Sequence, residues 1–236
     1  MSGQPLRISV IIPAYNEATT LPHVLARVHE QAIDGVELEI VVIDDGSTDE
    51  TDAVLRSHAH LLDHHIRLER NAGKGAAIIA GLGAATGAFI LCQDADLEYD
   101  PSDFQTLIRP VLFHGADLVM GSRLSAPPMT RVHYFWNKVG NRVLTTIFNV
   151  LHNTTFSDVY SGYLLLKRSA VEPAELRVHG WGQQAEILSL ATRRLRTLYE
   201  VPICYFGRSY DEGKKIRAHH FFGVVWAMLL TRLLRR

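Results

Sequence analysis

Three carboxylates stand within five residues of this sequence, at Asp94, Asp96 and Glu98. Like charges this close repel one another unless a cation neutralises them. Carboxylate oxygens suit Mg²⁺ or Mn²⁺, and an ion held there acts as a Lewis acid toward phosphate oxygens. An Asp-x-Asp pattern is weakly specific by itself, because a solvated acidic turn ending at Pro101 would contain the same residues. The choice between these interpretations depends on what else lies at this place in the fold.

Three further polar clusters, like residues 94–98, follow an apolar run of the chain. They are residues 15–17, 44–45 and 121–123, and each comes after an apolar run with the composition of a buried strand. The carboxyl ends of parallel strands meet at one edge of a sheet, and ligands bind in the crevice beyond that edge. The clusters therefore predict a single site rather than four unrelated turns.

Predicted strands and helices alternate along the first half of the chain and carry these clusters at their ends. Strands are expected over residues 8–12 (stopped by Pro13), 38–43, 66–69, 88–93 and 117–120, and helices over 19–31, 48–60 and 74–85. The less regular second half has expected helices over 137–152 and 183–194 and strands over 162–167 and 198–205. This order predicts an α/β fold: a mostly parallel, doubly wound sheet with helices on both faces.

The stretch Gly73-Lys74-Gly75 opens one of these helices, where backbone N–H groups and a lysine suit a phosphate. It satisfies neither the P-loop pattern nor Gly-x-Gly-x-x-Gly, since position 78 is Ile. Dinucleotide binding and P-loop hydrolysis are therefore disfavoured. A net charge of -1, with no basic stripe interleaved with aromatic residues, gives nucleic-acid binding no support.

The C-terminal stretch combines an apolar body with arginines. Residues 221–234 are interrupted by Arg232 and fall short of the roughly 20 residues that span a bilayer. We expect a main domain over residues 1–217 and an amphipathic helix over 218–236 that lies on a membrane surface. No apolar signal-peptide core precedes Ile8, so the expected location is the cytoplasm, peripheral at the cytoplasmic face of the membrane.

Several motifs occur in a defined order and spacing. They are Pro-Ala-Tyr-Asn-Glu at 13–17, Asp-Asp-Gly-Ser-Thr-Asp at 44–49, Gly-Lys-Gly at 73–75, Asp-Ala-Asp at 94–96, Gly-Ser-Arg at 121–123, Asp-Val-Tyr-Ser-Gly-Tyr at 158–163 and the stretch 201–214. This ordered set resembles family-2 glycosyltransferases with the GT-A fold, most of all the dolichyl- or polyprenyl-phosphate mannose synthase branch. The resemblance implies a GT-A catalytic domain that moves a hexose from GDP-mannose or UDP-glucose, with Mg²⁺ or Mn²⁺ as cofactor.

The resemblance also implies a role for each matching residue. The nucleoside would be held by Pro13, Tyr15, Glu17, Ile43 and Asp45, and the diphosphate and metal by Asp94, Ala95, Asp96 and, where some members have glutamine, Glu98. Arg123 would face the donor sugar and the acceptor phosphate, Arg131 would be a second ligand for that phosphate, and Arg208 and Lys214 would clamp phosphate groups. The residues before Glu186 depart from the pattern of many members, which leaves its role open.

The chemistry of the acceptor gives a further indication. A sugar hydroxyl needs a general base near neutral pH, whereas a lipid phosphate is already an anion and needs none. A sequence with candidate arginines and no obvious base favours a polyprenyl or dolichyl phosphate, with electrostatic catalysis. The alternatives are a transferase of the same fold that acts on a polysaccharide or soluble hydroxyl, and a nucleotide-binding regulatory protein without turnover.

Overall fold

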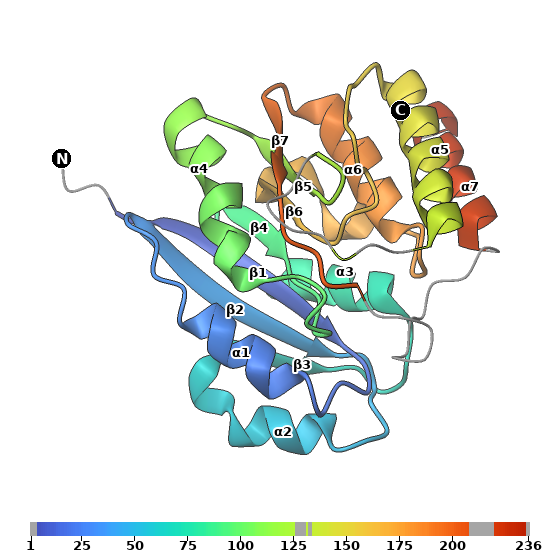
Figure 1. Cartoon of the computed structure of the whole chain (residues 1–236). Coiled ribbons are helices and arrows are strands. Elements are labelled where there is room, and N and C mark those ends of the chain that lie inside the picture. Colours follow the sequence, from blue (N-terminus) through green and yellow to red (C-terminus); the bar gives the residue numbers. More distant parts are fainter. Residues whose placement is uncertain (1–3, 126–130, 132–133, 208–219, 235–236) are drawn as a thin grey trace.

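The computed structural model describes residues 4–125, 131, 134–207 and 220–234 (Figure 1). These residues form one seven-stranded sheet with the order β3-β2-β1-β4-β6-β5-β7. The strands are β1 (Leu6–Ala14), β2 (Val36–Asp44), β3 (His64–Arg67), β4 (Phe89–Cys92), β5 (Leu118–Ser122), β6 (Leu164–Lys167) and β7 (Leu198–Pro202). Only β6 runs antiparallel to its neighbours, β4 and β5, within this sheet. The predicted α/β class with a mostly parallel sheet is confirmed.

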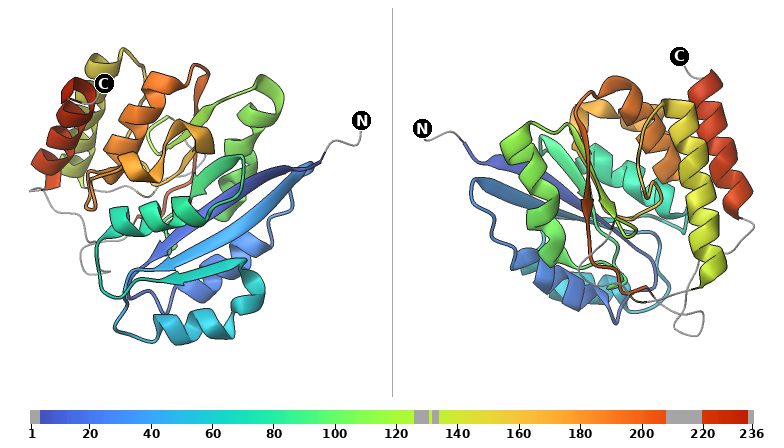
Figure 2. Two further views of the ribbon diagram at one scale, coloured as in Figure 1. Left: turned by 180° about the vertical axis from the view of Figure 1, so that it is seen from behind. Right: turned by 45° about the horizontal axis from the view of Figure 1, so that its top comes forward.

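Helices cover both faces of the sheet, as the two orientations of Figure 2 show. They are α1 (Leu21–His29), α2 (Thr51–Ser57), α3 (Lys74–Ala84), α4 (Phe104–His114), α5 (Phe135–His152), α6 (Gln183–Arg194) and α7 (His220–Leu234). One core cluster joins α1, α2 and α4 to the sheet, and the other joins α3, α5, α6 and α7 to its opposite face. Residues alternate between faces along a strand, so Ile8, Val10 and Ile12 of β1 enter the first cluster and Ile11 the second.

The prediction that Pro13 stops the first strand is wrong, since β1 continues to Ala14 and Pro13 pairs in register with Ile43. The Gln93 N–H donates to the Ile11 carbonyl, so alternate residues 11 and 13 direct their peptide groups toward β4. Strand β4 ends at Cys92, so it has no residue opposite Pro13 that would need a hydrogen bond from a backbone N–H at this position. A proline is tolerated wherever its missing N–H faces no neighbouring strand.

Two helices differ from the sequence-based expectation. Helix α2 begins at Thr51 rather than at 48, because the Asp49 carboxylate accepts hydrogen bonds from the N–H and hydroxyl of Thr51 and holds a turn before it. Helix α4 has no counterpart among the predicted helices. Pro110 lies inside it, where proline is unfavourable and weakens the helical signal.

The C-terminal helix α7 packs along α5 and α6 (Figure 1). Val224, Met228 and Thr231 are buried in this contact, and the Arg232 Nε donates to the Leu151 carbonyl at the end of α5 at 2.9 Å. Among the described helices, none has the length and apolar character needed to cross a bilayer.

Candidate active site

A cleft of about 350 Å³ opens beyond the carboxyl ends of β1, β2, β4 and β5. Pro13 lines it together with eight residues of the four polar clusters: Tyr15, Glu17, Asp45, Asp94, Ala95, Asp96, Glu98 and Arg123. The sheet thus brings together residues that are more than a hundred positions apart in the sequence. This convergence bears out the expectation of one site at one edge of a parallel sheet.

The Asp45 carboxylate organises the loop in front of α3. Its two oxygens accept hydrogen bonds from the backbone N–H groups of Ala72 and Gly73, at 2.8 and 2.9 Å. The resemblance implies that Asp45 holds the nucleoside, and the structure gives its carboxylate a role in holding the loop as well. Glu17 lies nearby and is buried, with its carboxylate accepting from the Thr20 hydroxyl at 2.9 Å.

The acidic residues after β4 form a tight turn that faces the cleft. Leu97 at its centre has φ = 62°, in the left-handed region that a branched non-glycine residue rarely adopts. The Asp96 Oδ1 accepts from the Glu98 N–H at 3.1 Å, and the Glu98 Oε2 accepts from the Tyr205 hydroxyl at 2.8 Å. The turn is held from both sides and lines a concave surface, so the interpretation as a freely solvated loop is wrong.

Lys74, the first residue of α3, extends its ammonium group to the Asp94 Oδ1. Burial would lower the pKa of Lys74, but the neighbouring charge of Asp94, with smaller effects of Tyr99 and Asp96, raises it above its usual value. The ammonium is therefore a fixed positive charge at the edge of the acidic turn. Sequence reasoning associated this lysine with a phosphate, and its ion pair with Asp94 was not anticipated.

Arg123 is held rigidly on the opposite side of the cleft. Its Nε and Nη2 donate to the two oxygens of the fully buried Asp158 at 2.7 and 2.9 Å, and Nη2 also donates to the Tyr160 carbonyl. The guanidinium carbon lies 5.0 Å from the centre of the Tyr205 ring. Within the described contacts, Nη1 is the nitrogen that remains for a ligand.

Several lining residues were not among those expected at the site from the sequence. They are Asn71, Tyr99, Tyr160, Gly180, Trp181, Gln183, Gln184 and Tyr205. The Tyr99 hydroxyl accepts from the Gly162 N–H at 2.7 Å, and burial raises the pKa of this hydroxyl to about 12. Tyr99 follows the acidic turn directly, which is the one local signal that would have found it. Tyr160 and Tyr205 lie within the motifs at 158–163 and 201–214, which would also have indicated them. The others come from distant loops and the start of α6, whose approach to the cleft no local pattern indicates.

Two residues of the expected set, Ile43 and Arg131, do not line the cleft, and two more are not described by the structure. Ile43 is completely buried in the core beneath α3 and is not among the residues that line the cleft. Arg131 also lies outside the lining, with its Nη1 donating to the Gly207 carbonyl at 3.2 Å. The positions of Arg208 and Lys214 fall outside the described residues.

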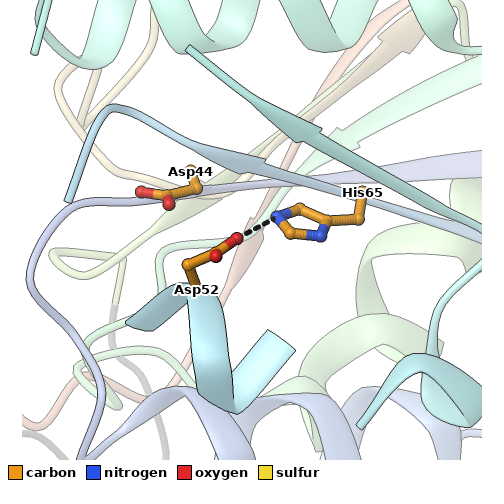
Figure 3. Close-up of side chains that lie close together, drawn as sticks. All are labelled: Asp44, Asp52 and His65. Carbon is orange, nitrogen blue, oxygen red and sulfur yellow. Dashed lines mark ion pairs between the residues drawn. The ribbon is translucent and has the colours of Figure 1, made fainter. Parts of the chain in front are cut away.

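A second group of metal-ligand types, Asp44, Asp52 and His65, lies outside the cleft (Figure 3). One ligand atom of each lies within 4.8 Å of the others. However, the Arg67 Nη1 and the Arg56 Nη2 each approach the Asp52 Oδ2 to 2.9 Å, and the Arg67 Nε is 3.5 Å from Asp44. Two guanidinium groups already balance the two carboxylates, so we assign this group to an ion-pair network that fixes α2 on β2 and β3.

Comparisons with known proteins agree with this geometry. Residues 9–173 match the family model of glycosyl transferase family 2. The chain is 31% identical to glycosyltransferase AglJ of Haloferax volcanii over 97% of its length and 72% of the relative's. It is 32% identical to the polyprenol monophosphomannose synthase of Mycolicibacterium smegmatis, over 94% of the chain and 87% of that protein.

Among solved structures, the chain resembles glucosyl-3-phosphoglycerate synthase from Mycobacterium tuberculosis in complex with Mn²⁺, uridine-diphosphate and glucosyl-3-phosphoglycerate. The TM-score is 0.71 at 23% identity, and the match covers 98% of this chain and 80% of the other. This likeness confirms the predicted GT-A fold. With its cleft of converging carboxylates and its match over most of the sequence, the chain belongs to glycosyl transferase family 2.

Proposed function

We propose that this glycosyltransferase moves a hexose, with mannose favoured over glucose, from a nucleotide-sugar to a polyprenyl or dolichyl phosphate with inversion at the anomeric carbon. The observation that carries the proposal is the arrangement of the cleft. The acidic turn after β4, with its partner Lys74, stands between Tyr15 and the buried Glu17 after β1 and the rigid cation Arg123 after β5. Nucleoside, diphosphate and acceptor would occupy these positions in that order.

The acidic turn supplies the ligands for a divalent ion. Asp94, Asp96 and Glu98 all line the cleft, and hard carboxylate oxygens suit Mg²⁺ or Mn²⁺. The ammonium of Lys74 on Asp94 indicates that this part of the turn accepts a positive charge. When bound, the ion would neutralise the charge that develops on the leaving nucleoside diphosphate. Lys74 would hold the same diphosphate from the other side.

The acceptor end is built for an anion. Arg123 keeps its charge because Asp158, despite the opposing effect of burial, raises the pKa of the guanidinium well above its usual value. A phosphate monoester attacks through an oxygen that is already ionised, so the site needs to orient it and offset its repulsion from the diphosphate. The name of the Mycolicibacterium smegmatis relative, a polyprenol monophosphomannose synthase, supports this acceptor class and mannose as the sugar.

Two neighbouring helices present aromatic side chains that suit a membrane surface. Tyr134, Phe135 and Trp136 at the start of α5 are 43%, 69% and 77% exposed. On α7, which packs beside α5, Phe222 and Trp226 are 76% and 62% exposed. Aromatic residues of this kind partition into the interface between lipid and water. We propose that this aromatic face brings the cleft to the membrane that holds the lipid acceptor.

A donor and acceptor screen tests the proposed function. Purified protein is incubated with radiolabelled GDP-mannose or UDP-glucose and a short polyprenyl phosphate, with Mg²⁺, Mn²⁺ or a chelator. We expect label in the lipid fraction only when the phosphate and a divalent ion are both present. Transfer to a free sugar or polysaccharide instead would favour a hydroxyl acceptor. Nucleotide binding without consumption of any donor would favour a regulatory protein.

A further inference from the structure

Glu186 is a buried acid in the first turn of α6, outside the lining of the cleft. Its carboxylate accepts hydrogen bonds from the backbone N–H groups of Arg177, at 3.1 and 3.2 Å, and of Val178, at 2.9 Å. A buried carboxylate that binds backbone N–H groups fixes the path of the chain that carries them. Residues 177–181, which we call the strap, are that chain.

The strap lies directly against the start of α3, backbone to backbone. The Gly75 N–H donates to the His179 carbonyl at 2.8 Å. A Cβ added at Gly73 would lie 2.7 Å from the His179 oxygen, and one at Gly75 would lie 2.5 Å from the Val178 oxygen. No side chain cushions this contact, so a shift of the strap moves the backbone on both sides of Lys74.

The other end of the strap forms part of the cleft. Gly180 and Trp181 line it, and the Trp181 carbonyl accepts from the Tyr160 hydroxyl at 2.6 Å. The strap thus touches both the helix start that carries Lys74 and the segment next to Gly162, which packs on Asp94. The strap is therefore in contact with the residues that position Lys74, and it carries Trp181 into the lining of the cleft.

We propose that Glu186 is a positioning residue for donor binding, acting through the strap on Lys74 and Trp181. The proposal rests on the proposed function, because it assumes that the cleft binds a nucleoside diphosphate with its metal. A residue that acts in this way changes the affinity for the donor without touching it. A purely structural acid would change only the stability of the fold.

The test uses Glu186→Gln, which keeps the shape of the side chain but presents an amide N–H₂ to backbone donors. The chain has three tryptophans, and Trp136 and Trp226 are both replaced by Phe. Trp181 is then the one tryptophan that remains, and the fluorescence reports on it alone. We expect its emission to shift to the red, and the Kd of GDP or UDP with Mn²⁺ to rise about tenfold, as for the loss of one hydrogen bond to a charged group. Glu186→Asp, which keeps the charge, should recover part of the affinity.

Glu175→Gln in the same background is the matched control. Glu175 precedes the strap, and its carboxylate forms an ion pair with Arg194 at the protein surface. Glu175→Gln should leave the Trp181 emission and the Kd of GDP or UDP with Mn²⁺ unchanged. Folding is checked by thermal melts, and if Glu186→Gln is insoluble, Glu186→Asp must show the same effects at smaller size.

The outcomes separate the two proposals. If the starting protein binds GDP or UDP and a folded Glu186→Gln variant binds it equally well with unchanged emission, the role of Glu186 is wrong and the proposed function stands. An equal loss in Glu175→Gln would also overturn it. If the starting protein binds neither nucleotide with Mn²⁺, the proposed function itself fails.

Discussion

Lys74 and Asp94 form an ion pair in the cleft, between the first residue of α3 and the acidic turn after β4. The pair joins a helix start whose N–H groups and lysine suit a phosphate to the segment that the resemblance to other glycosyltransferases associates with the diphosphate and the metal. A lysine that neutralises one carboxylate of a metal site weakens the binding of the metal ion and strengthens the binding of the diphosphate. This relation makes the two binding events separable by mutation.

Replacing Lys74 by Met should therefore change two affinities in opposite directions. Without the ammonium, Asp94 is more available to a cation, so the Kd of Mn²⁺ alone should fall. The Kd of GDP or UDP with Mn²⁺ should rise about tenfold, because a charge-assisted contact with the diphosphate is lost. Titration calorimetry measures both.

Lys167→Met serves as the control for this prediction. Lys167 pairs with Asp117, which stands just before β5 at the end of the strand away from the cleft. Lys167→Met should change neither the Kd of Mn²⁺ alone nor the Kd of GDP or UDP with Mn²⁺. Weaker Mn²⁺ binding in Lys74→Met would contradict the proposed competition.

Asp96→Asn should remove most of the turnover with little loss of stability. Its carboxylate faces the cleft, and the loss of one electrostatic contact to a transition state costs about 10²–10³-fold in kcat. Initial rates over a range of Mn²⁺ concentrations should also show weaker metal activation. Asp34→Asn, at an exposed site before β2, should behave as the starting protein. Full activity of Asp96→Asn, or of the starting protein in chelator, would exclude the metal role.

Asp158→Asn should disturb both stability and catalysis, because it leaves the Arg123 charge largely buried without its partner. Removing one member of a buried ion pair costs about 3 kcal/mol in the free energy of unfolding. Urea unfolding measures this loss, and kcat should fall because Arg123 is no longer held by two hydrogen bonds. The control Asp63→Asn removes a carboxylate that binds the Ile40 N–H far from the cleft and should leave kcat unchanged.

The buried Glu39 predicts a dependence of stability on pH. Although burial opposes ionisation, hydrogen bonds from Ser9 and Thr86 and the charge of Arg7 lower the pKa of Glu39 from 4.5 to about 2. A lowered pKa stabilises the fold fully above pH 4.5, and this contribution, about 3 kcal/mol, is lost as the pH falls through 2. The gap in unfolding free energy between the starting protein and Glu39→Gln should therefore shrink between pH 4.5 and 2.

The aromatic face of α5 and α7 predicts binding to anionic liposomes. Removing residues 218–236 should abolish pelleting, but it would also uncover the core contacts of Val224 and Met228. Serine in place of exposed aromatic residues is the cleaner test. Trp136→Ser and Trp226→Ser should each weaken binding about tenfold, since a buried aromatic side chain contributes about 1.5–3 kcal/mol. Phe113→Ser, equally exposed on α4, is the control, and pelleting that is unaffected by the first two changes would refute the proposed surface.

The alternation of strands and helices, and the order of the polar clusters at their ends, could be predicted from the sequence alone. Both are local properties: apolar periodicity reports which face of an element is buried, and the first polar residues after a buried run lie at the end of a strand. Since parallel strands point the same way, the clusters could be assigned to one edge before any contact was known. The cleft lining of Tyr15, Asp45, Asp94 and Arg123 follows from this reasoning.

Which charges face one another became evident only from the packing of the folded chain. Lys74 meets Asp94, Asp158 holds Arg123, and Glu186 holds the strap, although no spacing in the sequence indicates these pairs. Each pair joins two separate segments, and its formation depends on loop conformation, strand order and helix packing together. A side chain reaches its partner only within a few ångströms, so the physical reason is geometric: local patterns specify elements, and the packing of those elements specifies the contacts.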